Sequence, residues 1–155
     1  MTGIQTAYWL TDPCAENPWM PTFQLNLISP EKLLFEEPVD QVDLPGAEGD
    51  LGVLSGHAPI VTALRPGIVT ASTGAAREIF VVLGGVAEFS NESLTILAEF
   101  AAHVDEFDVG ELETRIAEMQ EALEGMPAGE ELDQVVARLD HYRSIQTNLI
   151  QTTAF

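Results

Sequence analysis

Three apolar runs in the middle of the chain decide the fold class: APIVTAL (residues 58–64), GIVTAS (67–72) and REIFVVLGGVAEFS (77–90). Valine, isoleucine and phenylalanine recur in these runs, and such side chains favour extended strands. The pairs Pro66-Gly67 and Gly84-Gly85 interrupt the runs and are typical turn signals. The pattern therefore predicts short β-strands in this region.

Strand-like patterns continue on both sides of these runs. Apolar and polar residues alternate from Phe23 to Leu27, and the run SLTILAEFAAHV (residues 93–104) is again strand-like. Turn-forming residues recur about every ten positions on average, which is typical of an all-β sandwich or barrel. These residues are Pro30, Pro45-Gly46, Gly56, Pro66-Gly67, Gly74, Gly84-Gly85 and Asn91.

The apolar period changes from two to between three and four near Asp105, which predicts two helices. Asp108, with Glu111 three residues later, predicts a capping box at the start of the first helix. Gly125 and Pro127 are expected to end that helix. A short loop and a second helix would complete an antiparallel hairpin. The predicted apolar stripes are Val109, Leu112, Ile116, Met119 and Leu123, then Leu132, Val135, Leu139, Tyr142 and Leu149.

The chain is thus expected to have three parts. Residues 1–19 show no period, contain Pro13 and Pro18, and precede a methionine, so we expect an extension that contributes little to folding. Residues 20–104 form the predicted β-sandwich domain, and residues 105–155 the helical hairpin domain. Because the two stripes of the hairpin can cover each other, the hairpin could rest on the sandwich or swing away from it.

Charge and composition exclude several classes of function. Twenty-five acids against six bases give a net charge of −19, which repels nucleic acids and anionic lipids and favours a basic protein partner. Acidity that serves solubility alone would give the same composition. The single cysteine, Cys14, excludes an internal disulfide and a cysteine-cluster metal site. No run of about 18 apolar residues predicts a membrane span.

The run GAEGDLGVLSGHAPIVTALRPG (residues 46–67) gathers polar residues among glycines. It fits no nucleophile elbow, dinucleotide fingerprint or phosphate loop. Ser55 and His57 could suggest a small hydrolase, but no acid is placed to orient the histidine. Glu48 and Asp50 are too few for a calcium loop. We therefore expect no catalytic residue, metal or cofactor, and a binding or regulatory subunit in preference to an enzyme.

A long ordered pattern resembles the epsilon subunit family of bacterial F-type ATP synthases, called delta in mitochondria. It begins LISPEKLLFEEPVDQVDLPGAEGDLGVLSGHAPIVTALRPGIVT, continues in FVVLGGVAEFSNESLTILAEFA, and ends in ELDQVVARLDHYRSIQTNL. The resemblance implies a ten-stranded β-sandwich followed by the hairpin. It also implies a non-catalytic rotor subunit between gamma and the c ring, coupling proton flow to ATP synthesis. Such a subunit is peripheral, on the cytoplasmic face of the bacterial inner membrane.

The resemblance also assigns contacts to single residues. Glu48, Gly49 and Asp50 match the family loop that meets the c ring, and His57 matches a position near gamma. The hairpin is expected to reach the alpha and beta subunits and could regulate ATP hydrolysis. A free-standing regulatory protein of the same fold is the alternative.

Two departures from the family pattern affect the hairpin. Where some members bind ATP through an arginine motif, this chain has Glu111, whose charge would repel a phosphate. We therefore expect no bound ATP. Inhibitory hairpins in the family commonly use basic residues, and here only Arg115, Arg138 and Arg143 are available. Inhibition by an extended hairpin is therefore left open.

Overall fold

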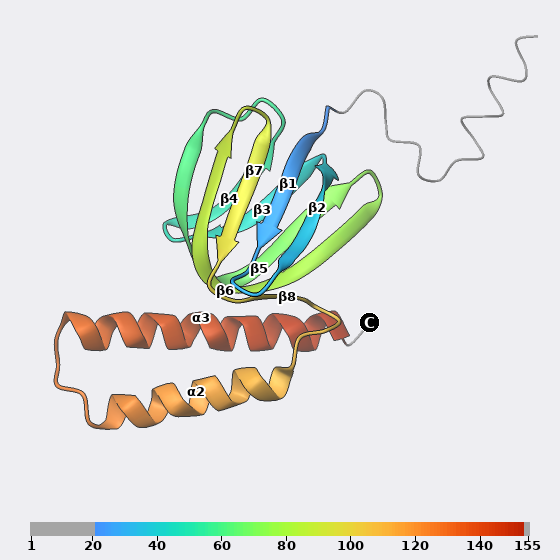
Figure 1. Ribbon diagram of the computed structural model, residues 1–155. Coiled ribbons are helices and arrows are strands. Elements are labelled where there is room, and N and C mark those ends of the chain that lie inside the picture. Colours follow the sequence, from blue (N-terminus) through green and yellow to red (C-terminus); the bar gives the residue numbers. More distant parts are fainter. Residues whose placement is uncertain (1–20, 154–155) are drawn as a thin grey trace, which may run out of the picture.

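The computed structural model describes residues 21–153, so the predicted extension 1–19 lies outside the described residues. Eight strands form a sandwich, and two helices lie side by side along one side of it (Figure 1). The strands are β1 (Phe23–Ile28), β2 (Leu33–Val39), β3 (Gln41–Gly46), β4 (Gly49–Leu54), β5 (Ile60–Thr73), β6 (Ala76–Ser90), β7 (Ser93–Ala98) and β8 (Ala101–His103). The helices are α2 (Val109–Glu124) and α3 (Glu130–Thr153).

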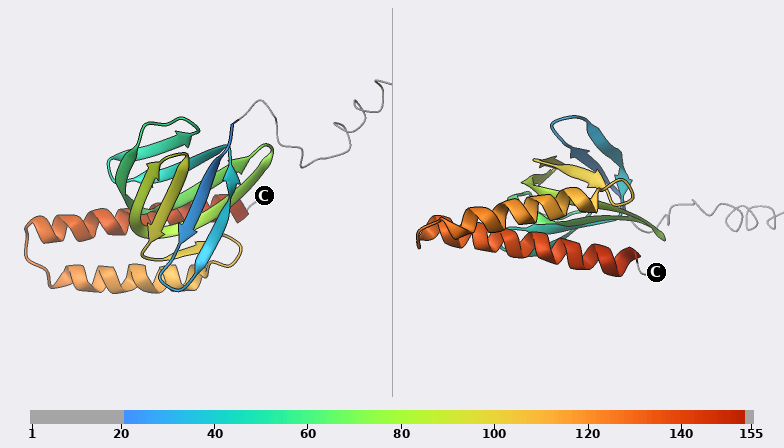
Figure 2. Two further views of the ribbon diagram at one scale, coloured as in Figure 1. Left: turned by 45° about the horizontal axis from the view of Figure 1, so that its top comes forward. Right: turned by 90° about the horizontal axis from the view of Figure 1, so that it is seen from below.

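One continuous ladder makes both layers of the sandwich, in the order β2-β1-β7-β6-β5-β3-β4, with β8 on β6. The long strands β5 and β6 run through both layers. Residues 85–90 of β6 pair with β7, whereas residues 80–82 pair with β8. We call β2, β1, β7 and the adjoining ends of β5 and β6 the outer layer. The rest of β5 and β6, with β3, β4 and β8, forms the hairpin-side layer (Figure 2).

The expected count of ten strands was wrong, although the β-sandwich was correct. Pro66-Gly67 and Gly84-Gly85 were interpreted as turns, but they lie inside β5 and β6. The pairs Leu64–Gly85 and Pro66–Leu83 keep one register across this point. Gly84 and Gly85 have φ values of +110° and +141°, so they bend the strand between the layers without reversing it. Counting each long strand once in each layer gives the expected ten.

The segment of β6 in the hairpin-side layer is buried on both faces, and it separates two cores. Phe80 and Val82 of β6 point into the core between the layers, while Val81 and Leu83 point into the core beneath the helices. All four are at most 2% exposed. A strand covered on both faces has a continuous apolar run in place of alternation. Burial on both faces therefore explains why residues 80–83, FVVL, are all apolar.

Both predicted helices are present, and their ends are largely as expected. The side chain of Asp108 accepts a hydrogen bond from the Gly110 amide at 2.8 Å, which confirms the cap at the start of α2. The reciprocal half of the capping box was wrong, because Glu111 pairs with Arg115 at 3.2 Å. Val109 was placed on the buried stripe but is 41% exposed, since it is the first residue of the helix.

In this structure the hairpin rests on the sandwich, with α3 between α2 and the strands (Figure 1). Polar contacts join the two parts as well as the apolar core. Arg138 of α3 pairs with Glu99, after β7, at 3.2 Å, and the Arg115 guanidinium lies 5.3 Å from the centre of the Phe100 ring. Within the described residues, neither helix has the length and apolarity needed to cross a membrane.

Candidate functional site

The predicted acidic contact is a tight turn between β3 and β4. Residues Ala47 and Glu48 make the turn, and the Ala47 amide donates to the Ala63 carbonyl at 2.9 Å, which fixes the turn to β5. Gly49 has a φ of +145°, which favours glycine. The side chain of Asp50 is 82% exposed, and Glu48 is also exposed. The structure thus brings Glu48, Gly49 and Asp50 together on one surface turn.

Arg65 of β5 holds this turn, although no role was predicted for it from the sequence. One guanidinium nitrogen donates to the Gly46 carbonyl, and another pairs with the Asp50 carboxylate. Arg65 therefore bridges both strands that flank the turn. Its side chain is only 26% exposed, so water competes less for it than for Asp50. Its position in the run LRPG, in a chain with six bases, was the available signal.

The glycines of this region allow β3 and β5 to approach closely. A Cβ atom on Gly67 would lie 2.5 Å from the Cβ atom of Pro45. Real Cβ atoms do not come so close, so no other residue fits at position 67 without displacing β3. The paired runs LPG (residues 44–46) and LRPG (64–67) are therefore two sides of one packing contact that presents the turn.

A cavity of about 460 Å³ joins the turn to the hairpin. Asp50 and Arg65 line it from the strands, and His141 and Ser144 line it from α3. Burial lowers the pKa of His141, the charge of Arg65 lowers it further, and Asp140 partly opposes this. The neutral form of His141 is therefore the form that fits beside Arg65.

This arrangement predicts that hairpin docking weakens at acidic pH. Because the folded pKa of His141 lies below its unfolded value of about 6.5, the unfolded chain binds the proton more readily. The contribution of neutral His141 to the free energy of docking is therefore fully present above about pH 6.5. It falls as the pH drops towards the pKa of His141 in the folded chain. Amide hydrogen exchange of α3, followed from pH 7.5 to 5.5, should show the loss. His141→Gln should flatten the profile, and an unchanged profile in that variant would contradict the assignment.

The predicted gamma contact, His57, lies on a different turn, between β4 and β5. Its ring nitrogen Nδ1 lies 2.7 Å from the Ala58 carbonyl, and its ring meets Phe89 edge-on, with ring centres 6.0 Å apart. The Ser55 hydroxyl donates to Glu92, on the turn between β6 and β7. Ser55 and His57 therefore do not form the nucleophile and base of a hydrolase.

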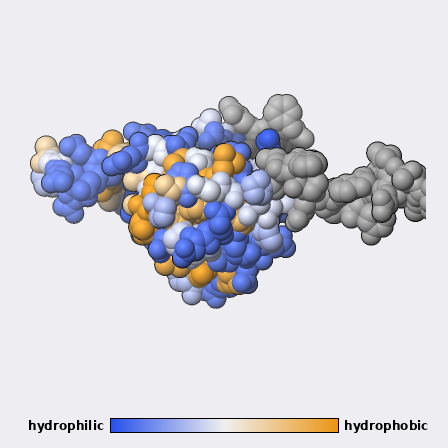
Figure 3. Space-filling model, turned by 90° about the horizontal axis from the view of Figure 1, so that it is seen from above, coloured by the Kyte–Doolittle hydropathy of each residue, from blue (hydrophilic) through white to orange (hydrophobic). Residues whose placement is uncertain are grey.

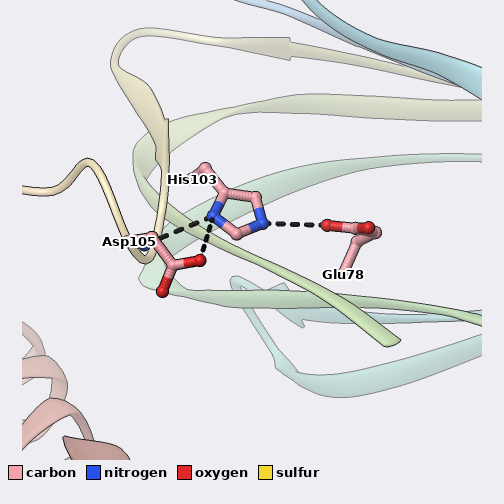
Figure 4. A network of polar contacts seen from close by, with 3 residues as sticks. All are labelled: Glu78, His103 and Asp105. Carbon is pink, nitrogen blue, oxygen red and sulfur yellow. Dashed lines mark hydrogen bonds and ion pairs between the residues drawn. The ribbon is translucent and has the colours of Figure 1, made fainter. Parts of the chain in front are cut away.

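His103 forms a separate polar cluster where the strands end and the hairpin linker begins (Figure 4). Its Nε2 atom lies 2.8 Å from Glu78 of β6, and its Nδ1 atom accepts from the Asp105 amide at 3.2 Å. These contacts tie the linker to the sandwich. Over residues 21–153, no three histidine, cysteine or acidic side chains are grouped so that they could hold a metal ion.

The outer layer carries an exposed apolar row, one residue from each of its strands. Leu33, Val86 and Leu97 are 50%, 44% and 56% exposed. Strand pairing places the members side by side in the order Leu33, Ile28, Leu97, Val86 and Ala63. Seen from the side opposite the hairpin, the sandwich shows several apolar patches, while the projecting end of the hairpin is largely hydrophilic (Figure 3). The turn at Ala47 joins the row at Ala63.

Comparison with known proteins agrees with this architecture. Residues 22–104 match the family described as ATP synthase, Delta/Epsilon chain, beta-sandwich domain. The chain is 59% identical over 136 residues to ATP synthase epsilon chain 2 of Nitrobacter hamburgensis, across 88% of this chain and all of that one. It is 51% identical over 133 residues to the ATP synthase epsilon chain of Rhodopseudomonas palustris BisB18, covering 86% and 98%.

Solved structures share the fold at lower identity. A chain of the Euglena gracilis mitochondrial ATP synthase, solved as an OSCP, F1 and c-ring assembly, has a TM-score of 0.67 at 24% identity and covers 92% of this chain and 93% of its own. A chain of the Tetrahymena thermophila mitochondrial ATP synthase, from its central stalk and c ring, has a TM-score of 0.53 at 12% identity, covering 85% and 96%. The sandwich, the hairpin and the close sequence matches together show that the chain belongs to the ATP synthase delta/epsilon family.

Proposed function

We propose that this chain is a central-stalk subunit of an F-type ATP synthase, and that it links gamma to the ring of c subunits. The observation that carries the proposal is the acidic turn, which Arg65 holds in place while Asp50 stays exposed. A turn fixed before binding loses little conformational entropy when it docks. Membership of the epsilon chain family confirms the expectation of a non-catalytic subunit.

The apolar row supports a large contact with gamma. Monomeric proteins seldom leave such neighbouring side chains uncovered, and a partner surface commonly buries them. Val61, at 68% exposure, extends the row along β5 towards His57. His57, which precedes β5, and the acidic turn, which is hydrogen-bonded to Ala63, therefore flank the first residues of β5. Six residues of extended chain span at most about 20 Å, so the two proposed contacts lie close together on one face of the sandwich.

Electrostatics supports the assignment of the acidic turn to the c ring. Asp50 can accept a charge-assisted hydrogen bond from a basic residue of the ring. The net charge of −19 would favour approach to a basic surface. In this assignment torque passes between gamma and the ring through the sandwich. The subunit would lie at the cytoplasmic face of the bacterial inner membrane, as a peripheral part of the complex.

Reversing the charge of Asp50 is expected to uncouple the enzyme. Asp50→Ala removes one exposed ion pair, worth about 0.2–1 kcal/mol of ring binding. Asp50→Lys places like charges together at the contact and beside Arg65, which costs several kcal/mol by order of magnitude. ATP-driven proton pumping and ATP hydrolysis, measured together in reconstituted vesicles, should show lost pumping with retained hydrolysis in the lysine variant.

Glu48→Lys is the matched control, because the side chain of Glu48 makes no hydrogen bond or ion pair among the described residues, whereas that of Asp50 pairs with Arg65. It changes the charge of the same turn by the same amount but leaves the Arg65 bridge intact. We expect a smaller loss of pumping than in Asp50→Lys. Equal pumping in the wild type and all three variants would show that the turn does not bind the ring.

The hairpin is assigned a regulatory role towards the alpha and beta subunits. Its docked position, in which the apolar core beneath the helices and the Arg138–Glu99 pair join it to the sandwich, is one of the two positions that such regulation requires. The alternative is a free-standing regulatory protein of the same fold. Affinity purification from detergent-solubilised membranes separates the two, because a rotor subunit must retain gamma and c. Recovery of the chain without either protein would favour the alternative.

A further inference from the structure

We propose that Glu92 is a positioning residue for gamma, holding the turn of residues 55–57 in the conformation that presents His57. This inference rests on the proposed function, since it takes His57 as the gamma contact. Glu92 belongs to another turn, between β6 and β7, 35 positions further along the chain than His57. No motif in the sequence singles it out.

The carboxylate of Glu92 binds two successive residues of the other turn. Its Oε2 atom accepts from the Ser55 hydroxyl, and its Oε1 atom accepts from the Gly56 amide at 2.9 Å. Its backbone carbonyl accepts from the Gln24 amide at 3.0 Å, which anchors the turn to the start of β1. Glu92 therefore joins the turn before His57 to the rigid end of the outer layer.

The backbone of Glu92 has a left-handed conformation, which bears on the role of its side chain. Asn91 and Glu92 have φ values of 51° and 57°, and they are the only non-glycine residues with positive φ in the described part of the chain. Glycine occupies this conformation without steric cost, and glutamate does so rarely. Glutamate at position 92 therefore makes the turn between β6 and β7 less stable than glycine would. The hydrogen bonds of its carboxylate offset this cost.

Those contacts control where His57 points. Gly56, with a φ of +82°, is the flexible link before His57, and its amide is one of the two groups that Glu92 binds. The His57 amide donates to the Leu54 carbonyl at 3.1 Å, and its ring meets Phe89. Once Gly56 is fixed, the direction of the His57 side chain is set before gamma arrives.

The test compares Glu92→Gly with Asn91→Gly in the full chain. Both variants relieve a left-handed backbone, but only Glu92→Gly removes the carboxylate. We expect amide exchange of Gly56, measured by NMR, to rise about tenfold in Glu92→Gly, the scale for losing a hydrogen bond to a charged group. Exchange of the His57 amide, which is hydrogen-bonded to Leu54, should rise with it as the turn loosens. The melting temperature of Glu92→Gly should not fall, and its affinity for purified gamma should drop severalfold. Asn91→Gly should change neither exchange at these amides nor affinity.

Two further variants make the outcome decisive. Glu92→Gln keeps an acceptor for the Gly56 amide and should largely restore protection and affinity. Unchanged amide exchange at Gly56 and His57 in Glu92→Gly would overturn the inference, whatever the affinity for gamma. The inference would also be overturned if Glu92→Gly bound gamma with full affinity while His57→Ala bound gamma weakly. If His57→Ala binds gamma normally, the His57 contact in the proposed function fails, and the exchange data still decide whether Glu92 holds the turn.

Discussion

Alanine at position 85 is expected to destabilise the sandwich by more than about 3 kcal/mol, in the upper range for single substitutions. A Cβ atom there would lie 2.2 Å from the Leu97 carbonyl oxygen and 2.8 Å from the Ala98 Cα atom. Both are backbone atoms of β7, and Gly85 pairs with Ala98, so the clash cannot be relieved without opening the ladder. The φ of +141° adds strain for any L side chain.

Gly49→Ala is the matched control for this prediction. Gly49 has nearly the same backbone conformation, with a φ of +145°, but a Cβ atom there meets nothing within 4 Å. It should therefore show the conformational cost alone, about 1–3 kcal/mol. Urea unfolding followed by circular dichroism measures both variants. Equal losses of unfolding free energy in the two variants would mean that β7 moves to make room for the added Cβ atom at position 85.

Aspartate at position 145 is expected to release the hairpin from the sandwich. Ile145 of α3 is 1% exposed and belongs to the core with Val81 and Leu83 of β6. An unpaired carboxylate in that core costs about 3–5 kcal/mol, and this cost opposes docking of the helix pair. Amide exchange should increase along α2 and α3 and stay slow in the strands. Small-angle scattering should show a more extended particle.

Val136→Asp on the same helix is the control, because Val136 is 41% exposed and should accept the charge with little effect. This experiment also tests the proposed division into a domain of residues 20–104 and one of residues 105–155. If the strands keep a cooperative melting transition when the helices are released, the two parts are separate folding units. Loss of all slow exchange in Ile145→Asp would mean one inseparable core.

The fold was predictable wherever the sequence pattern is local. Alternation at Phe23 to Leu27 and the cap at Asp108 depend on neighbours a few residues away, and both predictions were confirmed. The turns predicted at Pro66-Gly67 and Gly84-Gly85 were wrong because glycine and proline have the same local signal in a turn and in a bend within a strand. Only the pairing of Pro66 with Leu83, in one register with the pairs before it, shows that the strand continues.

The candidate site was predictable in part. The sequence singles out Glu48 and Asp50 as polar residues among glycines, and the resemblance to a family assigned them a partner. Arg65 lies in the same run, but its contact with Asp50, 15 positions away, could not be found in this way. Neither could the contact of Glu92 with Gly56, 36 positions away. Such contacts arise from strand pairing, and a single sequence carries no record of them. Assignment of the turn and of His57 to their partners stays a prediction.

The two long strands have a mechanical consequence. Because β5 and β6 pass through both layers, force applied to the exposed apolar row reaches the strands beneath the helices along covalent backbone. Two separate sheets would resist shear only through side-chain contacts, which can slide past each other. Here shear must stretch or bend continuous chains that are hydrogen-bonded along most of their length. Continuous strands of this kind would resist shear between partners bound on different sides of the sandwich, as the proposed rotor function requires.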